Sequence, residues 1–202
     1  MSTWGKYAAA ADGWSDDAYA DPAAYLAARA RVVVSIGPQL VPGDSVLDLA
    51  CGDGGLGDFL TEVHYLGVDA SPEMVLAASR RGRNVVCADM NEYEPPERVQ
   101  ATTIFRAIYY APDRAQLLRR IAGYTEKKLV FDLNPRQYRV EEVRADLRAA
   151  GFDRFELRPF FVPQTRAPAA WLRLLERSGP LARLILRRRF TYMCSASRAD
   201  AA

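Results

Sequence analysis

The sequence contains few of the residues that build metal centres, disulfide frameworks and histidine-based catalytic sites. Among its 202 residues the only histidine is His64, and the three cysteines, Cys51, Cys87 and Cys194, lack the spacing of a ligand set. We therefore expect no bound metal and no disulfide, and few options remain for a histidine-based catalytic triad. Because free cysteines are typical of reducing compartments, the expected location is the cytoplasm.

Long apolar runs are also missing. No stretch approaches the roughly 18 uninterrupted apolar residues of a membrane span, and residues 1–17 contain early acids instead of the apolar core of a secretory signal. Half of the residues are nevertheless hydrophobic and 26% are charged, which is typical of a soluble globular protein with a substantial core. The length predicts a single domain over residues 1–202.

Charge is unevenly distributed along the chain. Residues 1–100 carry 7 Lys and Arg against 15 Asp and Glu, whereas residues 101–202 carry 20 against 10. The basic excess is densest in an expected helical insertion over residues 162–189. Such asymmetry is typical of polyanion-binding surfaces, but a basic face that balances an acidic half of the same molecule also explains it. The insertion has few aromatics for base stacking, so we expect a small-molecule substrate, no nucleic acid, and a monomer or homodimer.

Short apolar runs alternate with helical patterns from residue 21 onward, which predicts an α/β fold with right-handed crossovers onto a parallel sheet. Asp21-Pro22 and Ser71-Pro72 each combine a capping residue with a first-turn proline, and therefore mark helix starts. The expected strands are 45–49, 64–68, 84–88, 101–108, 128–133, 152–161 and 191–196. The expected helices are 22–36, 56–63, 72–82, 113–122 and 140–150, with residues 1–40 forming a helical lid segment rich in aromatic side chains.

A glycine-rich loop follows the first strand. Gly52, Gly54 and Gly57 match the pattern G-x-G-x-x-G, and Asp69 ends the next strand, as in dinucleotide-binding proteins. Asp48, however, precedes the loop, where a carboxylate would oppose a pyrophosphate but suit a cation. Because we expect a single domain, no second domain is expected for a dehydrogenase substrate. The glycine pattern and Asp69 keep an NAD(P) oxidoreductase as an alternative, although Asp48 argues against it.

Four segments in order resemble the motifs of class I S-adenosylmethionine-dependent methyltransferases: LDLACGDGGLG, GVDAS, CADMNEY and ATTIFRAIYYAPD. The resemblance covers residues 46–130. It implies a Rossmann-like open sheet of about seven mostly parallel strands, with helices on both faces and the last strand antiparallel. It also implies S-adenosylmethionine as the cofactor and methyl transfer as the reaction.

The resemblance implies a role for each motif residue. The first motif would line the amino-acid end of the cofactor, the second would hold the ribose hydroxyls, the third would contact adenine, and the fourth would lie beside the methionine moiety. The implied cofactor-binding residues are, in that order, Asp48, Ala50, Gly52 and Gly54; Asp69 and Ala70; Asp89 and Met90; and Phe105 and Arg106.

Methyl transfer from a sulfonium needs in-line alignment and a dry pocket, and a hydroxyl acceptor must also lose a proton. His64 opens its strand at the end away from the cofactor, so we interpret it as structural. The candidate bases and substrate-binding residues after the fourth and fifth strands are Tyr109, Tyr110, Asp113, Asp132, Asn134 and Arg136, of which Tyr109 and Asp132 are the candidate catalytic residues.

We expect methylation of a small organic molecule, with O-methylation ahead of N- or C-methylation because it is frequent in the family. If no base is used, a neutral amine or an already acidic phenol becomes the expected acceptor. Two further alternatives are an RNA or protein methyltransferase that uses the basic C-terminal half, and a protein that binds S-adenosylmethionine without catalysis.

Overall fold

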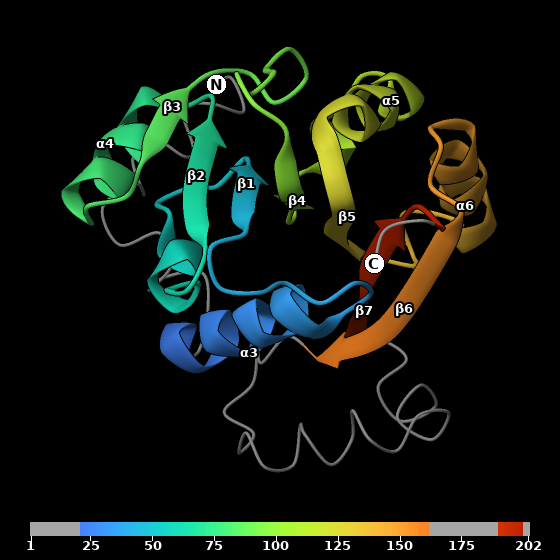
Figure 1. Cartoon of the computed structure of the whole chain (residues 1–202), viewed down its shortest axis with the longest axis horizontal. Helices are drawn as coiled ribbons and strands as arrows, with labels where there is room; N and C mark the ends of the chain where they lie inside the picture. The colour runs from blue at the N-terminus through green and yellow to red at the C-terminus, as the bar shows by residue number, and fades with distance from the viewer. Residues whose placement is uncertain (1–20, 162–189, 200–202) are drawn as a thin grey trace.

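The protein is built around one mixed β-sheet with helices packed on both faces (Figure 1). The computed structural model describes residues 21–161 and 190–199. The strands are β1 (Ser45–Leu49), β2 (His64–Asp69), β3 (Val85–Cys87), β4 (Val99–Ile104), β5 (Thr125–Leu133), β6 (Arg154–Phe161) and β7 (Phe190–Ser197). Their order is β3-β2-β1-β4-β5-β7-β6. The five strands β1 to β5 pair in parallel, while β7 runs antiparallel to both β5 and β6. The predicted Rossmann-like sheet with an antiparallel last strand is therefore confirmed.

Four α-helices and two short 3-10 helices connect the strands in the described part of the chain. They are α3 (Pro22–Ser35), η1 (Gly55–Phe59), α4 (Pro72–Arg80), η2 (Ile108–Tyr110), α5 (Arg114–Tyr124) and α6 (Val140–Ala149). The carboxylate of Asp21, the hydroxyl of Ser71 and the carboxylate of Asp113 each accept a backbone N–H in the first turn of the following α-helix. Two of these caps precede a proline, so the predicted starts of α3 and α4 are confirmed.

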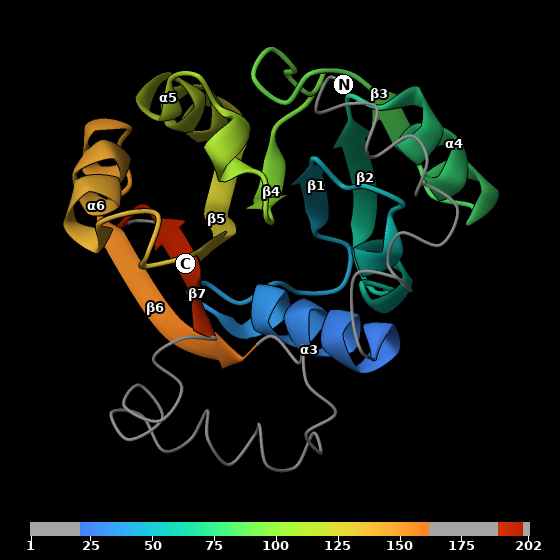
Figure 2. The same cartoon turned by 180° about the vertical axis from the view of Figure 1, so that it is seen from behind.

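The two faces of the sheet bury two separate clusters. Leu47 and Leu49 of β1 pack with residues of α5 and α6, whereas Val46 packs with residues of α3 and η1. Because both faces are covered, the central strands are almost wholly buried, as expected for parallel strands. Figure 2 shows the same arrangement from behind, with α3 on the opposite side of the strands from α5.

Three sequence expectations about element bounds are wrong. Instead of a helix over residues 56–63, the chain forms only the short η1, because Gly55 and Gly57 are poor helix formers and few residues remain before β2. Strand β4 ends at Ile104 and not at residue 108, because Arg106 adopts a left-handed conformation with φ 55°. Gly123 does not stop α5; it keeps a helical conformation, and β5 begins directly after Tyr124.

Several expectations fall outside the described residues. The first half of the expected lid segment, residues 1–20, and the basic insertion over residues 162–189 are among them. The single-domain assignment over residues 1–202, and the nucleic-acid alternative that depends on the insertion, stay predictions.

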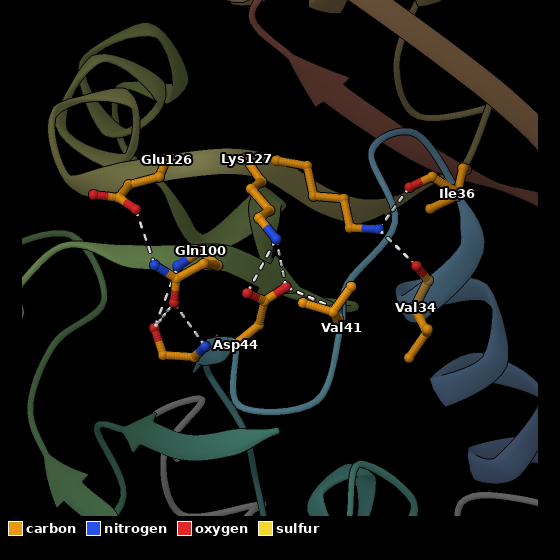
Figure 3. A network of polar contacts seen from close by, with 9 residues as sticks. Val34, Ile36, Val41, Asp44, Gln100, Glu126 and Lys127 are labelled. Atoms are coloured by element: carbon orange, nitrogen blue, oxygen red, sulfur yellow. Dashed lines mark hydrogen bonds and ion pairs between the residues drawn. The ribbon is translucent and has the colours of Figure 1, made fainter. Parts of the chain in front are cut away.

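A buried polar network anchors the C-terminal end of α3 to β5 (Figure 3). The Lys128 ammonium is fully buried and donates to the carbonyl oxygens of Val34 and Ile36, at 3.1 and 2.7 Å. Beside it, the Lys127 ammonium pairs with the Asp44 carboxylate at 2.8 Å. Cations favour helix C-termini, where the last carbonyls lack partners within the helix. The network therefore fixes how α3 lies across the sheet, and so where its other residues meet the site described next.

Candidate active site

The glycine-rich loop after β1 bends sharply at the carboxyl ends of the strands. Gly52 and Gly54 have φ of 60° and 69°, and Ala50 has φ 55°. Left-handed conformations are uncommon for residues other than glycine, and only Ala50 and Arg106 adopt them in the described part of the chain. Both residues line the same cavity, so the strained backbone of the molecule lies where a ligand would bind.

That cavity measures about 170 Å³ and lies over the tips of β1, β2 and β4. A second cavity of about 240 Å³ shares Ala50 and Asp69 with it. Of the ten residues predicted to bind cofactor, nine line one or both of these cavities. The first cavity is lined by Asp48, Ala50, Gly52, Asp69, Phe105 and Arg106. The second cavity is lined by Ala50, Asp69, Ala70, Asp89 and Met90. Asp48, Asp69 and Asp89 thus surround two hollows that share a wall. Their roles toward a ligand stay predictions.

Gly54 is the tenth residue, and it lines neither cavity. A Cβ at this position would lie 3.1 Å from the Cβ of Ala78 in α4 and 3.0 Å from the Cγ of Arg83. Gly54 therefore lets α4 and the segment after it pack closely against the loop.

Asp69 is oriented by the backbone around it. Its carboxylate accepts the N–H of Gly52 at 2.8 Å through one oxygen and the N–H of Ser71 at 2.9 Å through the other. Burial raises the pKa of Asp69, and these two hydrogen bonds oppose that rise. Because a carboxylate has about four lone-pair sites, capacity remains for two hydroxyl donors from a ligand. Asp89 is exposed, and its carboxylate also accepts the N–H of Asn91 at 2.8 Å.

Asp48 is held between the neighbouring strands. Its two oxygens accept the Thr103 hydroxyl at 2.6 Å and the Tyr65 hydroxyl at 2.8 Å. Burial raises the pKa of Asp48 to about 6, against the lowering effect of those hydrogen bonds and of the Arg29 charge. The charged form is therefore under-stabilised by the protein alone, which suits a group that receives a cation from a ligand.

Sequence analysis missed Arg29, a charged residue of α3 that lines the first cavity. Its side chain is only 5% exposed. The guanidinium lies 4.5 Å from the ring centroid of Tyr25 and 4.4 Å from that of Phe105, and it donates to the Tyr25 hydroxyl. Arg29 follows Tyr25 by one helical turn on the buried stripe that continues to Val33. A charged residue within an apolar stripe was the signal that could have found it.

The candidate catalytic residues lie beside a third cavity of about 240 Å³, which adjoins the first at Arg106 and Tyr109. Asp132 lines this cavity, and its carboxylate accepts the backbone N–H of Arg106 at 2.6 Å. Burial raises the pKa of Asp132, and the charges of Arg29 and Arg106 oppose that rise. Asn134 also lines the third cavity. The structure therefore brings Tyr109 and Asp132 to one place.

Other candidates lie elsewhere or have structural roles. Tyr110 lines the first and second cavities, whereas Asp113 caps α5. Arg136 lines none of the three cavities, and His64 is exposed at the start of β2, at the opposite end of that strand from Asp69. Within residues 21–161 and 190–199, no group of three or more His, Cys, Asp or Glu side chains is placed to hold a metal, and no helix is long and apolar enough to cross a membrane.

Comparison with known proteins agrees with this geometry. Residues 46–128 match the family model described as a methyltransferase domain. A trans-aconitate 2-methyltransferase of Mycobacterium tuberculosis is 32% identical over 79 residues, which are 37% of this chain and 30% of that protein. The chain thus spans less than a third of the length of this curated relative.

Two solved structures share the fold over most of the chain. A chain in the complex of the Haloferax volcanii Trm112 methyltransferase activator with a methyltransferase has a TM-score of 0.68 and 19% identity, covering 95% of this chain and 97% of its own length. Magnesium protoporphyrin IX methyltransferase of Synechocystis, solved with bound S-adenosylmethionine, has a TM-score of 0.56 and 15% identity, covering 98% and 85%. These solved structures share the fold of the chain, and residues 46–128 resemble a methyltransferase domain.

Proposed function

We propose that this chain transfers a methyl group from S-adenosylmethionine to a small organic acceptor, with oxygen as the favoured acceptor atom. The observation that carries the proposal is the placement of Asp48, Asp69 and Asp89 around two cavities that share a wall at the glycine-rich loop. Three carboxylates on neighbouring strand tips repel a pyrophosphate but suit a positively charged nucleoside with free ribose hydroxyls. The relatives that bind or use this cofactor support the same conclusion.

The residues present fit each part of that cofactor. Asp69 would accept the two ribose hydroxyls, because Gly52 and Ser71 already orient its carboxylate. Asp89 and Met90 in the second cavity would contact the adenine, and Asp48 would face the ammonium of the methionine moiety. When bound, the cofactor supplies an electrophilic methyl group on a sulfonium.

The chain's remaining task is to exclude water, align the acceptor and remove its proton. The third cavity is the proposed acceptor site, because it opens beside the first at Arg106 and Tyr109. Asp132 would take the acceptor proton through its carboxylate, and its raised pKa brings it nearer to the range of an effective base. Tyr109, which is 44% exposed and lines both the first and the third cavity, would contact the acceptor.

Small carboxylic acids are the first acceptors to test, because trans-aconitate names the substrate of the curated relatives. The binding experiment is a calorimetric titration of the full chain with S-adenosylmethionine, S-adenosylhomocysteine and NADH. We expect the first two to bind and NADH not to bind, and binding of NADH alone would overturn the proposal.

The activity experiment is incubation with S-adenosylmethionine and a panel of acids, phenols and amines, with S-adenosylhomocysteine measured by mass spectrometry. Acceptor-dependent formation of S-adenosylhomocysteine is the expected result. Tight cofactor binding with no product from any acceptor would favour a binding protein without catalysis.

A further inference from the structure

Two arginines in the turn between α4 and β3 contact the glycine-rich loop from outside the cavities. Arg81 pairs with Asp53 at 3.2 Å and with Asp58 at 2.9 Å. Arg83 pairs with Asp58 at 3.1 Å and donates to the carbonyl oxygen of Gly57, also at 3.1 Å. Neither arginine lines any of the three cavities described above, so neither is placed to touch a ligand in them.

Asp53 connects these arginines to the first cavity. Its side chain lines that cavity and is 3% exposed, whereas those of Arg81 and Asp58 are 33% and 30% exposed. One Asp53 oxygen accepts the N–H of Gly55 at 3.3 Å, and the other accepts a hydrogen bond from Arg81. Burying a carboxylate is costly without an opposite charge or hydrogen-bond donors. Arg81 therefore ties the loop, at the point where it lines the cavity, to the end of α4.

Local sequence does little to order the contacted segment, residues 53–58. Gly54, which precedes η1, has φ 69° and provides no side-chain cap, and η1 is a short 3-10 helix. Glycine loses more conformational freedom on ordering than any other residue. The stem of Arg83 packs closely against two of these glycines: a Cβ at Gly54 would lie 3.0 Å from its Cγ, and a Cβ at Gly57 would lie 3.0 Å from its Cδ. The order of this segment therefore depends on contacts from α4 and the turn after it.

We propose that Arg81 and Arg83 are positioning residues, which hold the glycine-rich loop in its cofactor-binding conformation before S-adenosylmethionine arrives. This inference rests on the proposed function and assigns a role to residues that do not contact the cofactor. Packing alone needs no charge, yet three of the four contacts are ion pairs directed at one short segment. When a ligand binds one loop conformation, its apparent affinity falls with the fraction of molecules that hold that conformation. Releasing the loop should therefore weaken binding without changing the bound state.

The test separates positioning from stability. Dissociation constants for S-adenosylmethionine and S-adenosylhomocysteine are measured by calorimetry on the full chain, for the wild type, Arg81→Gln, Arg81→Lys and Arg83→Met. Hydrogen exchange of residues 52–58 is followed by mass spectrometry without ligand and at saturating S-adenosylmethionine, and thermal melting reports the stability of each variant. Arg148→Gln is the matched control, because Arg148 is an exposed arginine in the last turn of α6 and lines none of the three cavities.

We expect Arg81→Gln and Arg83→Met each to weaken cofactor binding by roughly tenfold, as for a loop that holds its binding conformation about a tenth of the time. Arg81→Lys should retain part of the affinity, because it keeps the charge but lacks the planar fork that spans both carboxylates. Without ligand, residues 52–58 should exchange faster in the variants, and at saturation they should exchange as in the wild type. The KM for S-adenosylmethionine should rise while kcat at saturation stays unchanged. Melting temperatures should change little, because partly exposed ion pairs contribute little to stability.

Unchanged affinity in the arginine variants would overturn the inference. Faster exchange across the whole sheet alongside weaker binding would also overturn it, because the arginines would then serve stability alone. If an arginine variant does not fold, Asp58→Asn carries the test, since Asp58 pairs with both arginines and lines none of the three cavities. Failure of the wild type to bind either ligand would instead overturn the proposed function, so the two failures are distinguishable.

Discussion

The two ends of the sheet handle buried charge in opposite ways. At the end with Lys127 and Lys128, the charged groups are bound by the protein itself: Lys128 by two carbonyls at the end of α3, and Lys127 by Asp44. At the carboxyl ends of the strands, Asp48 and Asp132 have pKa values raised by burial and face cavities. Burial disfavours the charged form at both ends, because it lowers the pKa of Lys128 and raises that of Asp48. The comparison teaches that the surroundings distinguish them: Lys128 donates to protein carbonyls, whereas Asp48 and Asp132 face cavities in which a ligand can bind.

The largest expected effect is a loss of activity on substitution of Asp132, at the end of the sheet that faces the cavities. Asp132→Asn should lower kcat by about 100- to 10,000-fold, because the amide cannot take the acceptor proton, while the affinity for S-adenosylhomocysteine changes little. Steady-state kinetics with the best acceptor and calorimetry measure the two effects. Asp113→Asn is the control, since asparagine caps α5 as well as aspartate does. Unchanged kcat in Asp132→Asn would exclude this residue as the base.

The next effect concerns the opposite end, where we expect stability to respond to pH. Burial lowers the pKa of Lys128 from 10.5 to about 7, so between pH 7 and 10 the unfolded chain binds a proton that the folded chain has lost. The free energy of unfolding should therefore rise over this range through Lys128, by a few kcal/mol at about 1.4 kcal/mol per pKa unit.

The measurement is urea denaturation at a series of pH values for the wild type and Lys128→Met. The difference between the two curves isolates this lysine from other titrating groups. Parallel pH dependence in both proteins would show that the amine titrates normally and that its burial in the network is not as described.

A smaller effect is expected at Asp69. Asp69→Ala should weaken binding of S-adenosylmethionine by about 1–3 kcal/mol, because the ribose hydroxyls lose a charged acceptor. Calorimetry measures it, with Asp153→Ala, an exposed aspartate distant from the cavities in sequence, as the control. Wild-type affinity in Asp69→Ala would contradict the ribose role.

The smallest effect is a pH dependence of cofactor affinity through Asp48. Because the pKa of Asp48 is raised to about 6, lowering the pH through 6 neutralises the group that faces the ligand ammonium, and affinity should fall by up to roughly tenfold per pH unit. Asp48→Asn should bind more weakly at pH 7.5 and show a flatter profile between pH 5 and 7.5. A profile identical to the wild type would separate Asp48 from the ligand ammonium.

Much of the candidate site at the carboxyl ends of the strands could be predicted from local sequence. The capped starts at Asp21-Pro22 and Ser71-Pro72, the glycine-rich loop and the acids at or just beyond the carboxyl ends of β1 to β3 are short-range patterns with direct physical causes. Nine of the ten predicted cofactor residues accordingly line the cavities.

The missed features depend on contacts between distant segments. Thr103 holds Asp48 because these two residues are direct neighbours in the β1–β4 register, which no local pattern reveals. The predicted fourth strand is too long because the backbone turns at Arg106, whose N–H donates to the carboxylate of Asp132, 26 residues later. Arg29 was missed because its place in the first cavity depends on where α3 crosses the sheet.

The position of β7 between β5 and β6 determines when the sheet can be completed during synthesis. Strand β6 pairs only with β7 among the described strands, and β7 fills the gap between β5 and β6. Until residues 190–197 leave the ribosome, β5 and β6 lack the strand that pairs with both of them in the described part of the chain. The segments that resemble methyltransferase motifs, within residues 46–130, are thus translated before the strand that joins β5 to β6.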